Sequence, residues 1–448
     1  MSFTEKNNHS IKVPRLYKVA SKIIREVKEN RGSPKGLVFQ KPHPNVKALY
    51  ALVQETLKHS AMLDVLFEKT KFLENEYHVN PWLPSVLVTE LLWGKEKLPG
   101  ESKPVKSVLK YETTFRKLLS SHHFQVGQIQ FMGSEIGFPR SVRINSLVMT
   151  LSEAVEHFIS NGWVYVQKQP KNYEEFLCSV KHLGQNEFIS DFHISDMLIF
   201  APETNLVEDE LYKNGAIFLQ SKASCMASFL LNPRPGSVVL DMCAAPGMKT
   251  THLAALMEDS GILYAVEKDR QRTSTLKKMV KKSTATCVRV ACKDALTTSS
   301  ATLPGVEYIL VDPTCSGSGA YRNLDIPPEQ LNKLTKFQSM ILRHALTRFP
   351  DVKRVVYSTC SINAEENEQV VENVLSTVDT FEVKNILPNA WINRGNADYL
   401  GGSNCLYAKP GVDLTTGFFM AVFERKKCGP QSSDQNNVLK ESVHCRLK

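Results

Sequence analysis

The stretch SVVLDMCAAPGMKT, residues 237–250, joins a short apolar run to a loop of small residues. The run at 237–241 follows Gly236, and we expect it to form a buried strand. The loop after it contains neither G-x-x-x-x-G-K-[ST] nor G-x-G-x-x-G, so it is not a phosphate-binding loop. Its residues Ala244, Ala245 and Gly247 are small enough to let a ligand approach the backbone closely.

Outward from this stretch, predicted strands and helices alternate. Apolar runs predict strands at 262–267, 287–291, 307–311 and 355–358, and helical patterns lie at 249–258, 270–282, 330–348 and 364–376. This alternation predicts an α/β domain with a parallel, doubly wound, Rossmann-like sheet over residues 216–425. A late apolar run at 417–424 suggests an added antiparallel strand. Residues 426–448 are polar, and we expect a disordered tail.

Two further regions precede this domain. Residues 14–30 form an amphipathic pattern, and helical stretches follow near 44–60, 61–76 and 81–93, which predicts an all-helical domain over 1–135. Residues 136–215 differ, because a strand at 141–145, a helix opened by a capping box from Thr150 to Glu153, and a strand at 163–167 follow one another. We expect a small α+β module there, with a ferredoxin-like arrangement as one possibility.

The positive charge is concentrated at the N-terminus. The chain carries a net +9, and residues 1–50 hold 11 Lys/Arg against 3 Asp/Glu, a local excess of +8. Such an excess favours a nucleic-acid partner, and a solvated basic helix face is the alternative. No stretch approaches ~20 apolar residues, so we expect no membrane segment. The scattered cysteines lack a C-x-x-C pair and a zinc-ligand spacing, so we expect reduced thiols and no metal site. We also expect a monomer.

Acidic residues after the strands suggest a nucleoside-containing cofactor. Glu267 ends the second strand, 20 residues after Gly247, where a carboxylate can bind ribose hydroxyls. Arg272 borders the same region, and Asp294 follows the third strand. Acidic groups without a pyrophosphate cradle suit S-adenosylmethionine, and a generic dinucleotide fold is the alternative. The candidate cofactor-binding residues are Cys243, Ala244, Ala245, Pro246, Gly247, Met248, Lys249, Glu267, Arg272, Asp294 and Asp312.

Two cysteines follow two of the predicted strands. Cys315 lies in the segment DPTCSG and Cys360 in YSTCS, and the carboxyl ends of parallel strands are where ligands bind. Carbon 5 of a pyrimidine is a poor nucleophile, and addition of a thiolate to carbon 6 activates it. Methylation of an exocyclic amine needs no thiol. A buried small hydrophobe is the structural alternative for either cysteine.

The nucleophile must be favoured as a thiolate. Asn363 resembles the N-cap of the helix predicted at 364–376, so Cys360 would precede a helix N-terminus, whose partial charge lowers a thiol pKa. Glu365, Glu366 and Glu368 would oppose this effect if they faced the thiol. Lys249 is able to offset the charge of these glutamates or to donate a hydrogen bond to the target pyrimidine. Asp312 is able to reach either the methyl donor or the edge of the pyrimidine. A helix-start lysine and a turn-initiating aspartate are the alternatives.

Three motifs, in order, resemble the Nop/Sun (RsmB-like) family of RNA cytosine-5 methyltransferases over roughly 136–425. They are DMCAAPGMKT at 241–250, DPTCSGSG at 312–319 and YSTCS at 357–361. The resemblance implies that Cys360 is the nucleophile, that Cys315 helps to release the product, and that Lys249 contacts the target base. It also implies an RNA-binding role for the small module, whose Arg143-Ile144-Asn145 is similar to the family's R-x-N strand.

Two departures from the family motifs point to a subgroup. Met248 replaces a glycine and Thr314 replaces a proline, and both are similar to the Sun-domain members that methylate large-subunit ribosomal RNA. The segments GLV at 36–38 and LVTELLW at 87–93 are similar to the same members. The resemblance implies a ribosomal RNA or pre-ribosome partner and a nuclear, nucleolar location. An amine methyltransferase acting on RNA or protein, and a non-catalytic ribosome-assembly factor, remain as alternatives.

Overall fold

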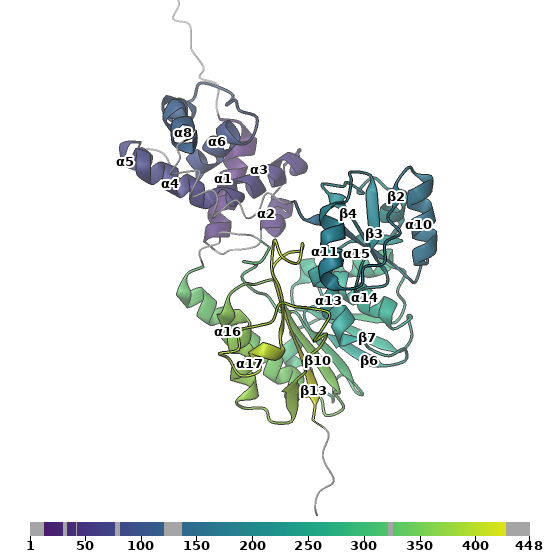
Figure 1. Cartoon of the computed structure of the whole chain (residues 1–448). Helices are drawn as coiled ribbons and strands as arrows, with labels where there is room; N and C mark the ends of the chain where they lie inside the picture. The colour runs from purple at the N-terminus through teal and green to yellow at the C-terminus, as the bar shows by residue number, and fades with distance from the viewer. Residues whose placement is uncertain are drawn as a thin grey trace, which may run out of the picture.

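The computed structural model describes residues 13–29, 34–41, 43–76, 81–120, 137–320 and 326–426 (Figure 1). The expected boundary between residues 135 and 136 and the expected tail from residue 427 onward lie outside the described residues. In the described ranges, no helix combines the length and apolar character that crossing a membrane requires.

The N-terminal region is helical and has its own core, which Figure 1 shows at one end of the molecule. Helices α1, α3 and α6 pack together around apolar side chains such as Ile23, Leu49 and Leu87. On α1, Lys18 and Lys22 are exposed, because they lie opposite this buried stripe. The helices are α1 (Arg15–Lys28), α2 (Pro34–Gln40), α3 (Val46–Lys58), α4 (Ser60–Thr70), α5 (Phe72–Asn75), α6 (Trp82–Leu92), α7 (Lys103–Lys110) and α8 (Glu112–Ser120).

The small module is a mixed sheet with helices. Its strands run in the order β2-β3-β4-β1-β5, and β1 pairs antiparallel with both β4 and β5. The predicted capping box is confirmed, because Thr150 and Glu153 exchange hydrogen bonds at the start of α10. The elements are β1 (Pro139–Ile144), α10 (Leu151–Ser160), β2 (Val164–Tyr165), α11 (Tyr173–Lys181), β3 (Glu187–Ser190), β4 (Met197–Pro202), α12 (Glu210–Asn214) and β5 (Ile217–Leu219).

The large sheet confirms the predicted Rossmann-like α/β fold. Its order is β11-β13-β10-β9-β6-β7-β8, with parallel pairing from β10 through β8 and with β13 antiparallel to β10. The predicted late antiparallel strand is therefore present, and it is inserted between β10 and β11. The strands are β6 (Val238–Asp241), β7 (Ile262–Glu267), β8 (Val288–Cys292), β9 (Tyr308–Val311), β10 (Arg354–Thr359), β11 (Phe381–Val383), β12 (Leu406–Ala408) and β13 (Phe418–Arg425).

Helices cover both faces of this sheet. Alternate residues of a strand point to opposite faces, so Val239 joins the core under α13 and α14, and Leu240 joins the core under α16 and α17. Apolar side chains of α15 pack over β7 beside the small-residue loop. The helices are α13 (Lys222–Leu231), α14 (Met248–Leu256), α15 (Arg270–Lys282), η1 (Ala295–Thr297), α16 (Pro328–Thr347), η2 (Ala364–Glu366), α17 (Glu368–Leu375) and η3 (Gly402–Asn404).

Buried polar contacts fasten the small module to the α/β domain. Arg143 of β1 is fully buried and donates to Gln220 at 2.9 Å and to Thr251 of α14 at 2.9 Å. Asn145, also buried, donates to the carbonyls of Gly215 and Ser283, each at 3.0 Å. The R-x-N segment is therefore buried between the two domains, and it is not an exposed surface for RNA.

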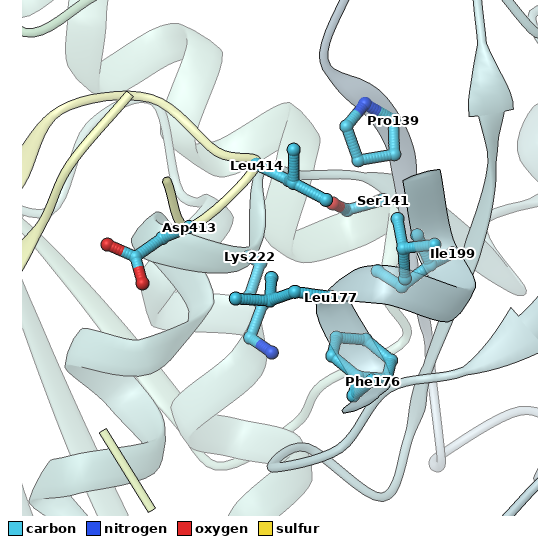
Figure 2. Close-up of a pocket in the computed structure, with 9 residues that line it drawn as sticks. Pro139, Ser141, Phe176, Leu177, Ile199, Lys222, Asp413 and Leu414 are labelled. Carbon is cyan, nitrogen blue, oxygen red and sulfur yellow. The ribbon is translucent and has the colours of Figure 1, made fainter. Parts of the chain in front are cut away.

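A second fastening contact lies at a small pocket between the same domains (Figure 2). The ammonium of Lys222, at the start of α13, lies 2.7 Å from a carboxylate oxygen of Asp191, and both side chains are buried. The rings of Tyr173, Phe176 and Trp391 lie 4.6–5.9 Å from this ammonium. Burial lowers the pKa of Lys222, and Asp191 opposes that shift. The small module is thus held by an ion pair inside an aromatic enclosure.

Candidate active site

The two motif cysteines meet at the carboxyl ends of adjacent parallel strands. Cys360 directly follows β10, Cys315 lies four residues after β9, and their Sγ atoms are 3.2 Å apart. The two thiols are free and partly buried. The hydrogen bond from the Cys315 thiol lowers the pKa of Cys360, and Lys249 acts in the same direction. The pKa of Cys315 is raised by the same hydrogen bond and by burial. Cys360 is thus the thiol that ionises first.

Lys249 and Asp312 form a second unit beside the thiols. The ammonium of Lys249, on the first turn of α14, donates to Oδ2 of Asp312 at 2.8 Å, and the hydroxyl of Ser358 donates to Oδ1 at 2.6 Å. Burial by itself lowers the pKa of Lys249, but the ion pair and hydrogen bond with Asp312 outweigh burial, so the pKa is raised overall. The ammonium also lies 5.2 Å from the centre of the Phe418 ring. The lysine therefore stays charged next to Cys360.

The small-residue loop connects β6 to α14. Ala244 and Ala245 are buried, whereas Pro246 is exposed, and burial raises the pKa of the Cys243 thiol well above its ordinary value. Gly247 has a φ of +111°, and a Cβ there would lie 3.0 Å from side-chain atoms of α15. A glycine is therefore required here by the packing against α15, and the expectation that Gly247 lets a ligand approach the backbone stays a prediction. Met248 is half-buried, and its carbonyl accepts from Arg143 at 3.4 Å.

The acidic cofactor candidates lie at the ends of β7 and β8. Glu267 is 5% exposed, and its carboxylate lies 3.3 Å from the guanidinium of Arg272. Arg272 also donates to the carbonyl of Ala245 at 2.8 Å, which joins this pair to the loop. Asp294 forms a separate pair with Lys268 at 2.8 Å, and the hydrogen bond from that lysine lowers the pKa of Asp294. Glu267 and Arg272 are thus brought to the loop, whereas Asp294 follows β8, the strand beside β7.

The segment after Cys360 differs from the prediction. A short 3-10 turn, η2, runs from Ala364 to Glu366, the backbone breaks at Asn367, and α17 begins only at Glu368. Asn363 caps no helix, because its amide donates to Ser316 and Glu366. The predicted helix is therefore confirmed over 368–375, but it begins four residues later than predicted, so its N-terminus lies farther along the chain from Cys360 than we expected. The thiol pair and Lys249 supply the polarisation that we assigned to a helix N-terminus.

Three groups at the site lacked a strong signal in the sequence. Asp241 is buried at the end of β6; one of its oxygens accepts from Thr250 at 2.8 Å, and the other has no partner within the described ranges. Burial raises the pKa of Asp241 to about 7. Ser358 orients Asp312, and its place two residues before Cys360 in the YSTCS motif could have suggested a role. Glu366 was expected only as an opposing charge.

The fold and this arrangement define a class I methyltransferase, because a parallel sheet with its last strand inserted antiparallel is that class's topology. Residues 228–424 match the family model "16S rRNA methyltransferase RsmB/F". Residues 138–220 match the ferredoxin-like domain of NOL1/NOP2/Sun domain family member 5, and residues 47–125 match its N-terminal domain. The chain belongs to the NOL1/NOP2/Sun domain family, in its member 5 group.

Relatives are similar over nearly the whole chain. A 28S rRNA (cytosine-C(5))-methyltransferase of Drosophila melanogaster is 39% identical over 436 residues, which cover 95% of this chain and 99% of the relative. One of Mus musculus with the same name is 37% identical and covers 95% and 94%. The 25S rRNA (cytosine-C(5))-methyltransferase rcm1 of Schizosaccharomyces pombe is 34% identical and covers 91% and 90%.

Solved structures share the fold at low identity. The crystal structure of PH0851 has a TM-score of 0.62 at 20% identity, and the match covers 93% of this chain and 100% of that chain. NSun6 from Pyrococcus horikoshii with SFG has a TM-score of 0.51 at 20% identity and covers 70% and 97%. These two structures support the fold assignment alone.

Proposed function

We propose that this protein transfers a methyl group from S-adenosylmethionine to carbon 5 of a cytosine in large-subunit ribosomal RNA. The observation that carries the proposal is the thiol pair, 3.2 Å apart at two strand ends and adjacent to Lys249 and Asp312. Full-length similarity to enzymes named for 28S and 25S rRNA cytosine methylation supports the substrate. Methylation of an amine needs no thiol, so it would not explain why two thiols meet at this position.

The residues around the loop fit S-adenosylmethionine. Glu267 is a buried carboxylate at the end of β7, suited to ribose hydroxyls, and Asp294 lies after β8. Asp241 has a buried carboxyl oxygen that has no hydrogen-bond partner within the described ranges, which leaves an acceptor for a polar group of the ligand at the start of the loop. When bound, this donor supplies a methyl group on a sulfonium, which is open to attack by a carbon nucleophile. Holding the donor is the proposed role of the loop 243–248, Glu267, Arg272, Asp294 and Asp312.

Cys360 acts as the nucleophile in this proposal. Its thiolate attacks carbon 6 of the cytosine, so that an Sγ–C6 bond forms and the electron pair of the ring double bond moves to carbon 5. Carbon 5 thereby becomes nucleophilic enough to take the methyl group. Loss of the proton from carbon 5 restores the double bond and expels the Cys360 thiolate. The lowered pKa of Cys360 supports this role, because only the thiolate adds to the ring.

The other groups serve the same cycle. Cys315 assists release of the methylated base, and its raised pKa keeps it protonated near the leaving sulfur. Lys249 donates to the polar edge of the base and balances the charge that develops during addition. Asp312 orients Lys249 and lies within reach of the pyrimidine edge or of the donor.

The substrate class sets the expected partner and location. We propose that the protein binds large-subunit ribosomal RNA, bare or within a pre-ribosomal particle, and works in the nucleolus, where such RNA is made. The exposed basic face of α1 supports a contact with phosphates. We also propose that the small module contributes to RNA binding through surfaces other than its buried R-x-N segment.

The test is methyl transfer from labelled S-adenosylmethionine to unmodified ribosomal RNA, followed by digestion to nucleosides. Label in 5-methylcytidine supports the proposal. Label in an N-methylated nucleoside would replace it with amine methylation. RNA binding without any labelled nucleoside, on both bare RNA and isolated pre-ribosomes, would instead favour an assembly factor without catalysis.

A further inference from the structure

We infer that Glu366 is a positioning residue that clamps the two cysteine loops together and gives the two thiols different roles. The inference rests on the proposed function for its catalytic consequence, and on the geometry for the clamp itself. Glu366 ends η2, two residues before α17 begins, and its side chain is fully buried. A buried carboxylate that contacts no substrate needs a compensating set of hydrogen-bond donors.

That set is complete, and it comes from both loops. Oε1 of Glu366 accepts from the backbone N–H of Ser316 at 2.8 Å and from Gln338 of α16 at 3.0 Å. Oε2 accepts from the hydroxyl of Ser361 at 2.5 Å and from the amide of Asn363 at 3.2 Å. All four partners are donors, so the pocket is built for a group with acceptors alone.

Two of these donors directly follow the cysteines. Ser316 is the residue after Cys315, and Ser361 is the residue after Cys360. Each oxygen of one carboxylate therefore holds the chain next to one thiol. The hydroxyls of Ser316 and Ser361 are also 3.2 Å apart, which closes the connection between the loops. Removal of the carboxylate would release both loops at once, and the 3.2 Å contact between the sulfur atoms depends on both.

The charge of Glu366 acts unequally on the two thiols. Its electrostatic effect helps to raise the pKa of Cys315, after the larger effects of the thiol–thiol hydrogen bond and burial. Lys249 helps to lower the pKa of Cys360, against the opposing charge of Asp312. Glu366 thus acts on the thiol whose pKa is raised, and Lys249 acts on the thiol whose pKa is lowered. This asymmetry matches a nucleophile paired with a protonated partner.

The decisive variant is Glu366→Gln. An amide keeps the size of the side chain, but its NH2 group can accept from none of the four donors, so the partners on that side must turn to accept or stay unpaired. Glu365→Gln is the matched control, because Glu365 carries the same charge one residue earlier and is exposed. Each variant would be compared with the wild type by thermal denaturation, by kcat and KM on ribosomal RNA, and by alkylation of Cys315 and Cys360 with iodoacetamide, resolved by mass spectrometry.

For Glu366→Gln we expect kcat to fall about 100-fold with little change in the KM for RNA, since a misplacement of reacting groups by about 1 Å costs that much. The preference of iodoacetamide for Cys360 over Cys315 at neutral pH should shrink. Glu365→Gln should behave as the wild type in all three assays. A folded Glu366→Gln protein whose kcat and alkylation preference equal those of the control would overturn the inference.

Two arrangements keep the outcome clear. If Glu366→Gln fails to fold, Ser361→Ala removes one donor and leaves the carboxylate; a smaller loss of kcat and of alkylation preference is expected, and unchanged values overturn the inference. If the wild-type protein methylates no RNA, the proposed function fails. The alkylation preference then still decides whether Glu366 positions the thiols, because that assay needs no substrate.

Discussion

The ammonium of Lys249 lies 2.8 Å from Oδ2 of Asp312, across the gap between the first turn of α14 and the end of β9. This ion pair brings a fixed positive charge next to Cys360, and the lysine lowers the pKa of that thiol. Asp312 in turn is fixed by the hydroxyl of Ser358, which donates from the neighbouring strand β10. Three segments of the sheet edge thus meet beside one sulfur, where Lys249 lowers the pKa of Cys360 and the charge of Asp312 raises it.

Lys249→Met should therefore weaken Cys360 as a nucleophile. Loss of the positive charge raises the pKa of Cys360, so its alkylation by iodoacetamide should slow near pH 7 and recover as the pH rises above the new pKa. Methyl transfer should fall by about 100-fold, in line with the removal of one electrostatic group from a site. Lys353→Met is the control, because that lysine pairs with Glu307 at the opposite end of the strands. If the rate of Cys360 alkylation depended on pH in the same way in both variants, this role of Lys249 would be contradicted.

Substitution of the cysteines should separate their roles. Cys360→Ala should abolish methyl transfer, since no thiolate remains to add to carbon 6. Cys315→Ala should accumulate a protein–RNA adduct that survives denaturing electrophoresis, because release of the base is slowed. Cys178→Ala, at an exposed position on α11, should leave both properties unchanged. Persisting activity in Cys360→Ala would show that another group is the nucleophile.

Asp241 should make the stability of the protein depend on pH. Its carboxyl has a pKa of about 7 in the folded state, against 3.8 ordinarily, so the folded state binds the proton more tightly than the unfolded state. Stability from this group is complete below about pH 4 and is lost as the pH rises through 7. The total is on the order of 4 kcal/mol at 1.36 kcal/mol per pH unit.

Asp241→Asn removes that dependence. Denaturant unfolding at pH 4.5 and pH 8 should show a smaller loss of stability between the two values for the variant than for the wild type. Asp351→Asn, at an exposed position, provides the reference for an ordinary carboxylate. If the free energy of unfolding fell by the same amount between the two pH values in the wild type and in Asp241→Asn, the carboxyl would not be protonated in the folded protein.

The buried Lys222–Asp191 pair should stabilise the junction of the two domains. Lys222→Met leaves Asp191 buried without its partner, and such losses cost about 3–5 kcal/mol. The double variant Lys222→Met, Asp191→Asn should recover part of this cost, because the uncompensated charge is gone. Thermal unfolding of both variants checks the prediction, with Lys213→Met as a control at an exposed ion pair. A loss below 1 kcal/mol for Lys222→Met would contradict it.

The basic face of α1 should give RNA binding a steep salt dependence. Each phosphate contact releases counterions, so replacing Lys18 and Lys22 by Gln should weaken binding and reduce the slope of log Kd against log salt by about two. The measurement is RNA affinity between 50 and 200 mM salt, about the range over which such contacts change most. Lys58→Gln and Lys69→Gln form a control pair on α3 and α4. An unchanged slope would place the RNA elsewhere.

Most of the fold could be predicted because its signals are local. The apolar run before Asp241 forms β6 as predicted, and the runs at 262–267 and 355–358 form β7 and the centre of β10. Where strands alternate with helices, each helix crosses back over the sheet, so the two strands that it connects run parallel. The start of the helix predicted over 364–376 was wrong, for a reason outside its own sequence. Asn367 turns its amide to Ser361 and accepts from Thr359, which breaks the helix between Glu366 and Glu368.

By itself, the sequence determined the chemistry: the thiols follow strands, carboxylates follow the neighbouring strands, and these placements depend on a few adjacent residues. Only the tertiary structure decided which groups meet. Glu366 contacts Ser316 across 50 residues, and Arg143 contacts Thr251 across 108. A buried charge must find its donors wherever the packed chain supplies them, and no periodicity marks such partners. The burial of Arg143 and the clamp at Glu366 are therefore properties of the folded chain.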